Sequence, residues 1–172
     1  MADLKYTFNW GLIGDLQAGR PNLGNSTRLE VYRLMQFSFR DVLEKRYGAE
    51  AVDQIFYEAG LLAGKEFYQN VIGPMNDFRE LIQALQKNLQ DFKIGILRLE
   101  EADLQTGELF LSVAEDLDCS GLPEMDDEIC IYDEGFIAGI LEAFSGRRYD
   151  VKEIDCWCTG GRTCRFNAKV VV

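Results

Sequence analysis

Four stretches of the chain carry apolar residues at steps of three and four positions, which is the spacing of amphipathic helices. Ser26 or Thr27 can cap the first helix, whose apolar face is unusually broad. Glycines interrupt the pattern, as expected where helices end. The predicted helices cover residues 27–46, the stretch between Gly48 and Gly73, Phe78 to Leu89, and Phe136 to Phe144.

Other stretches change to a period of two residues, which is typical of strands with one buried face. Ile94–Leu97 and Leu109–Val113 flank a polar turn and predict an antiparallel hairpin. A second hairpin is predicted around Thr159-Gly160-Gly161. The order of helices, hairpin, helix and hairpin predicts an α+β fold, with helices packed on an antiparallel sheet of four to five strands.

The chain of 172 residues is long enough for one domain with a full core, and 47% of its residues are hydrophobic. Because the sequence contains no internal repeat or linker, we expect a single domain over residues 1–172. We divide it into an N-terminal arm at 1–26, a helical part at 27–92, and a part with sheet, helix and second hairpin at 93–172.

The chain carries 29 acidic and 18 basic residues, a formal net charge of −11. This charge repels phosphate backbones and anionic lipid surfaces, so direct nucleic-acid binding is not expected. The first residues lack the pattern of a signal peptide, and no apolar stretch is long enough for membrane insertion, so we expect a cytoplasmic protein. Histidine is absent, which excludes His-based catalytic triads and leaves sulfur and carboxylate as metal ligands.

Three of the five cysteines lie in the predicted C-terminal hairpin. If this hairpin turns through a three-residue loop, Cys156 lies opposite Cys164. The same register sets Ile154 opposite Phe166, and these two apolar side chains indicate that their face of the hairpin points inward. Cys158 shares that face because side chains alternate along a strand.

Cys130 lies near the start of the fourth predicted helix, which must pack on the same face of the sheet. It can therefore complete a thiolate-rich tetrahedral zinc site, closed to water and of the structural type. Two alternatives stay open: the thiols are ordinary core residues, or Cys156 and Cys164 form a disulfide. Cys119, alone in an acidic loop, is expected to be an ordinary core residue.

The C-terminal part of the chain closely resembles the signature of the 4-vinyl reductase domain family in the sequence IYDEGFIAGILEAFSGRRYDVKEIDCWCTGGRTCRF. The resemblance covers residues 128–167 and rests on a helix with the pattern E-G-F-x-A-G, a strand, a turn with glycine and Cys-Arg-Phe. It implies a fold similar to that of the palmitate-binding subunits of the TRAPP tethering complex. It also implies a homodimer formed through helices, which suits the broad apolar face of the first helix.

The resemblance further implies a ligand set for the zinc ion. Related sensor domains of phenol- and toluene-responsive bacterial activators bind zinc through Cys, Glu, Cys and Cys. The same spacing occurs in this chain at Cys130, Glu153, Cys156 and Cys164. Strict alternation sets Glu153 on the opposite strand face from Cys156, so this set requires a β-bulge, and Cys158 is the competing fourth ligand.

Domains of this family are thought to bind small hydrophobic molecules, so the resemblance implies a pocket for a small apolar or aromatic ligand. The phenol sensors hold the phenolic hydroxyl with a histidine, which this chain lacks, so phenol specificity is not carried over. Phenylalanines at helical or strand spacing are either pocket residues or ordinary core. The candidates for the pocket are Phe37, Phe39, Phe56, Phe67, Phe110 and Phe136.

Three functions follow from these features. The leading interpretation is a ligand-binding sensor or carrier whose output goes through a separate effector protein. The alternatives are an enzyme or accessory protein of vinyl reduction in tetrapyrrole metabolism, as the founding members of the family suggest, and a dimeric scaffold without ligand. The chain has no Rossmann or P-loop glycine pattern and no obvious nucleophile pair, so catalysis is the less favoured reading.

Overall fold

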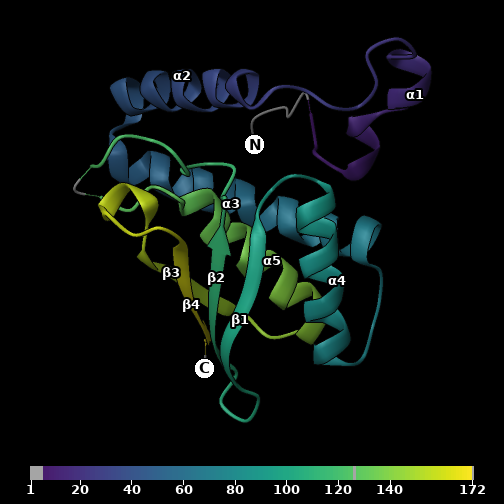
Figure 1. The fold of residues 1–172 in the computed structure, drawn as a ribbon, viewed down its shortest axis with the longest axis vertical. Coiled ribbons are helices and arrows are strands. Elements are labelled where there is room, and N and C mark those ends of the chain that lie inside the picture. The colour runs from purple at the N-terminus through teal and green to yellow at the C-terminus, as the bar shows by residue number, and fades with distance from the viewer. Residues whose placement is uncertain (1–5, 126, 172) are drawn as a thin grey trace.

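A computed structural model describes residues 6–125 and 127–171, with helices leading into a sheet and a further helix packed on it (Figure 1). The helical elements are two short ones, Trp10–Ile13 and α1 (Leu16–Gly19), the long helices α2 (Leu29–Tyr47) and α3 (Ala49–Phe67), a π-helical turn at Tyr68–Ile72, α4 (Phe78–Asp91), α5 (Ile131–Ser145) and a 3-10 turn at Trp157–Thr159. The strands are β1 (Ile96–Asp103), β2 (Glu108–Ala114), β3 (Tyr149–Asp155) and β4 (Cys164–Val170).

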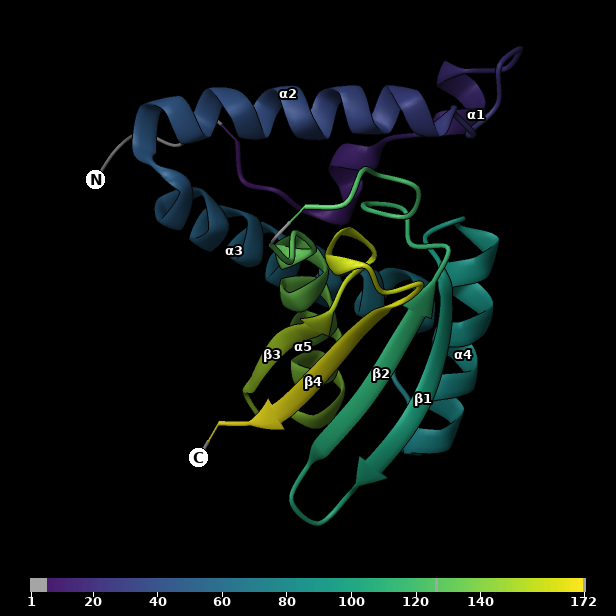
Figure 2. The ribbon, with the colours of Figure 1, turned by 60° about the vertical axis from the view of Figure 1, so that its left-hand side comes forward.

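The four strands form one antiparallel sheet in the order β1-β2-β4-β3. After β2 the chain crosses through α5 to the edge strand β3 and returns in β4, between β2 and β3. The predicted α+β fold, with helices on an antiparallel sheet, is confirmed. In Figure 2 the strands lie side by side in this order, with β1 at one edge and β3 at the other.

The helices cover one face of the sheet in layers. α4 packs on β1 and α5 packs on β3 and β4, while α3 lies against α5 and α2 against α3. The core therefore forms between the sheet and the layer of α4 and α5, from apolar residues that alternate along the strands. The strand residues buried there include Leu97, Leu109, Leu111, Val113, Val151, Phe166 and Ala168. Within the described part of the chain, no helix has the length and apolarity needed to cross a membrane.

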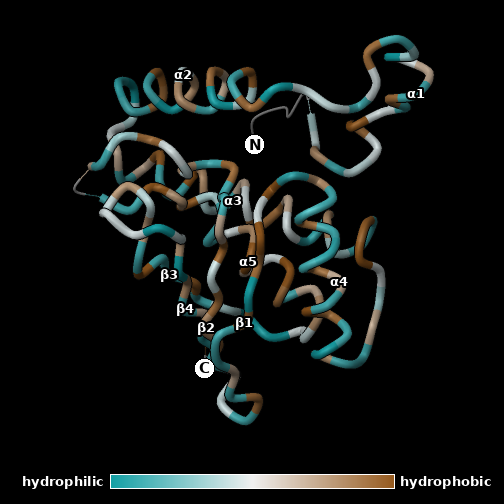
Figure 3. Tube along the Cα trace, viewed as in Figure 1, coloured by the Kyte–Doolittle hydropathy of each residue, from teal (hydrophilic) through white to brown (hydrophobic). Residues whose placement is uncertain are grey.

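Helix α2 makes polar contacts with the body of the protein and leaves most of its apolar side chains exposed to solvent. The Tyr32 hydroxyl donates a hydrogen bond to Asp118 Oδ1 at 2.7 Å, and the Arg33 guanidinium donates to the carbonyl oxygen of Leu117 at 2.9 Å. Apolar segments recur along α2 in Figure 3, and its exposed apolar side chains are Leu29, Val31, Leu34, Met35, Phe39 and Val42. The broad apolar face is thus present but uncovered.

The start of α2 differs from its prediction. Its N-cap is Arg28, whose side chain makes no capping hydrogen bond, so neither Ser26 nor Thr27 caps the helix. The backbone is still extended at Arg28, with φ −79° and ψ 145°, and the helix therefore begins after the predicted caps.

The register of the C-terminal hairpin was predicted wrongly. Phe166 pairs with Glu153 rather than with Ile154, and the pairing shifts between Glu153 and Asp155. Glu153 shares the inward face with Tyr149 and Val151 and is 7% exposed. The shift after it leaves Ile154 40% exposed and lets Cys156 point inward as well. The turn is also longer than three residues, because the 3-10 turn at Trp157–Thr159 precedes further loop residues before β4. The β-bulge that would bring Glu153 and Cys156 to one face is therefore present.

Candidate metal centre and ligand cavity

Four buried cysteines meet where the loop after β2, the start of α5 and the C-terminal hairpin come together. Their ligand atoms all lie within 4.8 Å of one another. Cys130 Sγ lies 3.9 Å from Cys156 Sγ and 3.8 Å from Cys164 Sγ, and Cys119 Sγ lies 3.0 Å from Cys164 Sγ. All four side chains are fully buried. We call Cys119, Cys130, Cys156 and Cys164 the cysteine cluster.

The donor set of the cysteine cluster fits a zinc ion. Sulfur atoms at about 2.3 Å from a tetrahedral zinc lie about 3.8 Å from one another. The two distances from Cys130 match this value, and the Cys119–Cys164 pair would have to open slightly. Contacts among the thiols of the cluster lower the pKa of Cys156 and raise the pKa of Cys130, so the cluster by itself favours one thiolate, at Cys156.

Cys119 reaches the cluster because the loop after β2 folds back on itself. Asp116 Oδ1 accepts the backbone N–H groups of Asp118 at 2.8 Å and of Cys119 at 3.1 Å. The sequence analysis predicted an ordinary core residue at Cys119, whereas the structure places it beside the other thiols. The signal for it was the Asp-Leu-Asp-Cys segment, in which an aspartate side chain can hold the backbone that follows it.

Glu153, the ligand that the family spacing implies, lies beside the cluster but outside the group of four sulfurs. Its Oε2 accepts the backbone N–H of Cys130 at 3.1 Å, and its Oε1 is buried without a hydrogen-bond partner among the described residues. Burial, followed by the charge of Cys156, raises the pKa of Glu153 to about 8. Cys158 is also buried, but its sulfur is outside this group.

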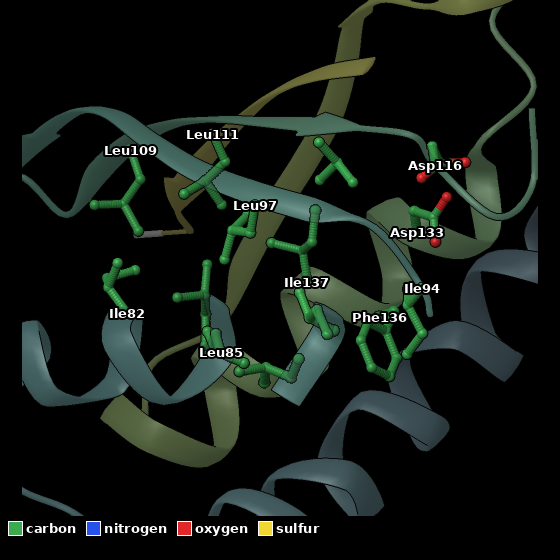
Figure 4. Close-up of a pocket in the computed structure, with 14 residues that line it drawn as sticks. Ile82, Leu85, Ile94, Leu97, Leu109, Leu111, Asp116, Asp133, Phe136 and Ile137 are labelled. Atoms are coloured by element: carbon green, nitrogen blue, oxygen red, sulfur yellow. The ribbon is translucent and has the colours of Figure 1, made fainter. Parts of the chain in front are cut away.

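A cavity of about 40 Å³ lies between α4, α5 and the inner face of β1 and β2 (Figure 4). Its walls are apolar except at one end and include Ile82, Leu85, Leu97, Leu111, Phe136 and Ile137. One water molecule needs roughly 10–15 Å³ of such space. An organic ligand therefore requires α4 and α5 to move slightly apart.

Asp116 and Asp133 lie next to each other at the polar end of the cavity (Figure 4). Burial, followed by the charge of Asp118, raises the pKa of Asp116 to about 7. Burial and the charge of Asp116 also raise the pKa of Asp133 well above its usual range. Asp116, Asp133 and Cys130 place ligand atoms within 4.8 Å of one another, so this end of the cavity adjoins the cysteine cluster. Neither aspartate stood out in the sequence.

Of the aromatic residues predicted for the pocket, Phe136 lines the cavity. Phe67 is buried behind it, with 5.3 Å between the two ring centroids. Phe110 alternates with Leu109 and Leu111 and lies on the other face of the sheet, where the Arg165 guanidinium covers it. Three of the predicted residues do not line the cavity, because they belong to α2 and α3, which lie outside the layer of α4 and α5. They are Phe37, Phe39 and Phe56.

Sequence comparison places a 4-vinyl reductase domain at residues 109–170 of the chain. Two proteins of Methanocaldococcus jannaschii are similar over most of their length. The uncharacterized protein MJ0150 is 29% identical over 161 residues, which is 92% of this chain and 86% of the relative. The uncharacterized protein MJ1642 is 24% identical over 149 residues, which is 87% of this chain and 81% of the relative.

Three crystal structures share the fold. A vinyl-4-reductase family protein from Methanocaldococcus jannaschii has a TM-score of 0.59 at 17% identity, covering 87% of this chain and 85% of its own. The phenol-responsive sensory domain of the transcription activator PoxR with phenol has a TM-score of 0.59 at 12% identity, and the match covers 84% of this chain and 75% of the sensory domain. Subunit 3 of the trafficking protein particle complex from Naegleria fowleri, covalently bound to palmitic acid, has a TM-score of 0.65 at 14% identity. The match covers 84% of this chain and 95% of the subunit.

These identities are low, so the three structures bear on the fold alone. The resemblance to the 4-vinyl reductase domain family that the sequence indicates is confirmed by the domain match. Residues 109–170 match the 4-vinyl reductase domain, and the fold of the chain is similar to that of a vinyl-4-reductase family protein.

Proposed function

We propose that this protein is a sensor or carrier of a small apolar ligand and that a structural zinc ion stabilises it. The observation that carries the proposal is the apolar cavity between α4, α5 and the sheet, with polar groups at one end only. Concave apolar sites with a few convergent polar groups are the usual form of small-molecule sites. The phenol bound by the PoxR domain and the palmitic acid bound by the trafficking subunit support a ligand role for this fold.

The cysteine cluster is the proposed zinc site. Four buried thiolates fill a tetrahedral shell, so the ion would stabilise the fold and leave no position for water or substrate. We assign the fourth ligand to Cys119 rather than to Glu153, because the Cys119 sulfur belongs to the group of ligand atoms within 4.8 Å of one another and Glu153 does not. Cys158 and Glu153 remain the competing ligands for the experiment described in the Discussion.

Helix α5 links the two sites. It begins directly after Cys130 and carries Phe136, Ile137 and Ile140 on the wall of the cavity. A ligand that parts α4 from α5 must therefore shift a helix whose N-cap residue, Cys130, belongs to the proposed zinc site. Such a shift would change the conformation that a separate effector protein recognises when the ligand is bound.

We further propose a cytoplasmic homodimer that uses α2. A helix with polar contacts to the body and apolar residues in solvent is the reverse of an ordinary surface helix. Leu34 is 71% exposed and Met35 67% exposed, and exposed apolar side chains that gather on one face indicate an interaction surface. A second copy of α2 would cover this face.

Native mass spectrometry of the purified protein tests the ligand role. We expect a bound small apolar molecule, or binding of added toluene, and about one zinc ion per chain. Ile137→Phe should abolish ligand binding because it fills the cavity, whereas the control Ile55→Phe, on an exposed position of α3, should not. Protein that carries no ligand and takes up no toluene would contradict the proposal.

A further inference from the structure

The polar end of the cavity contains an acceptor that lacks a donor. Asp133 Oδ2 is buried and, among the residues described, has no hydrogen-bond partner. Asp133 lines the cavity together with Asp116, and Figure 4 shows the two carboxyl groups facing the same end of the apolar space. A buried polar atom without a hydrogen-bond partner lowers the stability of a fold. An unpaired acceptor in a cavity wall is therefore suited to a ligand that supplies the missing donor.

The two carboxyl groups have different roles in this geometry. Asp116 is fixed by the loop, because its Oδ1 accepts the N–H groups of Asp118 and Cys119. Asp133 lies in the first turn of α5, on the same helix as Phe136 and Ile137. Its carboxyl group is therefore held at a fixed place relative to the apolar wall and stays free to accept a hydrogen bond.

The charges around Asp133 select the kind of head group. The groups that act on Asp133 are Asp116, Asp118, Glu153 and Cys164, and each of them is acidic. The basic group Arg33, on the adjacent helix α2, acts on Asp118 and donates to backbone carbonyl groups of the loop. In the part of the chain that the structure describes, no Lys or Arg lines the cavity, so a carboxylate ligand would find no counter-charge at this end, whereas a group with an O–H or N–H bond can donate to the free oxygen of Asp133.

We infer that the cavity binds small apolar molecules that end in a hydroxyl or amine, and that this head group donates a hydrogen bond to Asp133 beside Asp116. The inference rests on the proposed ligand-binding function and adds the chemical class of the ligand. A cation is the competing occupant, because Asp116, Asp133 and Cys130 lie close enough to share one. Cys130 is already part of the cysteine cluster, which argues for a head group instead.

Titration calorimetry of the zinc-loaded full chain tests the inference with four probes built on the same ring: toluene, benzyl alcohol, benzylamine and benzoate. Benzyl alcohol and benzylamine should bind at least about tenfold more tightly than toluene, since they satisfy the free acceptor. Benzoate should bind more weakly than toluene. Equal affinities for toluene, benzyl alcohol and benzylamine would overturn the inference and leave apolar binding intact, whereas failure of all four probes would overturn both.

Substitutions at Asp133 test whether this residue causes the preference for a hydroxyl head group. Asp133→Leu should remove the preference for benzyl alcohol over toluene, and Asp133→Asn should keep that preference because an amide oxygen still accepts a hydrogen bond. Glu58→Leu is the control, since Glu58 is an exposed acid of α3 that does not line the cavity. Elemental analysis should give about one zinc per chain in each protein. A second metal equivalent that disappears in Asp133→Leu would assign the carboxyl groups to a cation and overturn the inference.

Discussion

A Cβ atom at Gly135 would lie 2.0 Å from the backbone carbonyl oxygen of Tyr57, so helices α5 and α3 pack with their backbones in contact. Gly139 repeats this approach one turn later on α5, where a Cβ atom would lie 2.2 Å from the carbonyl oxygen of Leu61. The glycines that α3 contributes to the same contact are Gly60 and Gly64. This packing fixes α5, which follows Cys130 of the cysteine cluster and forms one wall of the cavity.

Gly135→Ala should therefore destabilise the protein by about 3 kcal/mol, because the added methyl group meets backbone atoms that cannot rotate away. Urea unfolding followed by circular dichroism measures the change in the free energy of unfolding. Gly19→Ala is the control, since a Cβ atom there has no neighbour within 4 Å, and it should change stability by less than about 0.5 kcal/mol. Similar losses in both variants would contradict the role of the helix contact.

The E-G-F-x-A-G pattern was recognised in the sequence, but the role of each residue in it comes from partners far away in the chain. Gly135 and Gly139 admit α3, and Phe136 lines the cavity. Periodicity predicted the helices and strands because it reflects which face of an element is buried. It contains no information about which helix meets which, and so the contact with Tyr57 could not be predicted.

Glu134, the first residue of that pattern, should stabilise the edge strand β3. It is 2% exposed, its Oε1 accepts the backbone N–H of Glu153 at 2.8 Å, and its Oε2 accepts from Lys152 Nζ at 3.0 Å. Glu134→Leu should cost about 1–3 kcal/mol, because it leaves the N–H of Glu153 buried and unpaired. Glu134→Gln keeps an acceptor and should cost clearly less. Equal losses of unfolding free energy in the two variants would exclude the hydrogen bond as the cause.

The cysteine cluster could be predicted in part. The sequence placed Cys130, Cys156 and Cys164 together, although the predicted pairing of Ile154 with Phe166 was wrong. They still meet because the bulge and the longer turn carry Cys156 inward. The position of Cys119 depends on a loop that is held by hydrogen bonds from its backbone to the Asp116 side chain. Such a loop has no periodic pattern, so its course could not be predicted from the sequence.

The fourth zinc ligand can be identified by comparing three variants. Cys119→Ser should lower the zinc content well below one ion per chain and cost several kcal/mol of stability, since the energy of a structural zinc site contributes to folding. Cys158→Ser and Glu153→Gln should retain the ion, because neither side chain belongs to the cysteine cluster. Elemental analysis and chemical unfolding give both quantities. Loss of zinc in Glu153→Gln with retention in Cys119→Ser would restore the ligand set that the family spacing implies.

Leu34→Glu should convert the proposed dimer into a monomer. Leu34 is 71% exposed on the apolar face of α2, and a buried carboxylate at the centre of an interface would remain unpaired. Analytical ultracentrifugation over a range of concentrations should give a dimer for the unchanged chain and a monomer for the variant. Gln83→Glu adds the same charge at an exposed position of α4 and should leave the dimer intact. The circular dichroism spectrum should be the same for all three proteins, because Leu34 makes little contribution to the core of its own chain. A monomer in the unchanged protein at every concentration would rule out α2 as a dimer interface.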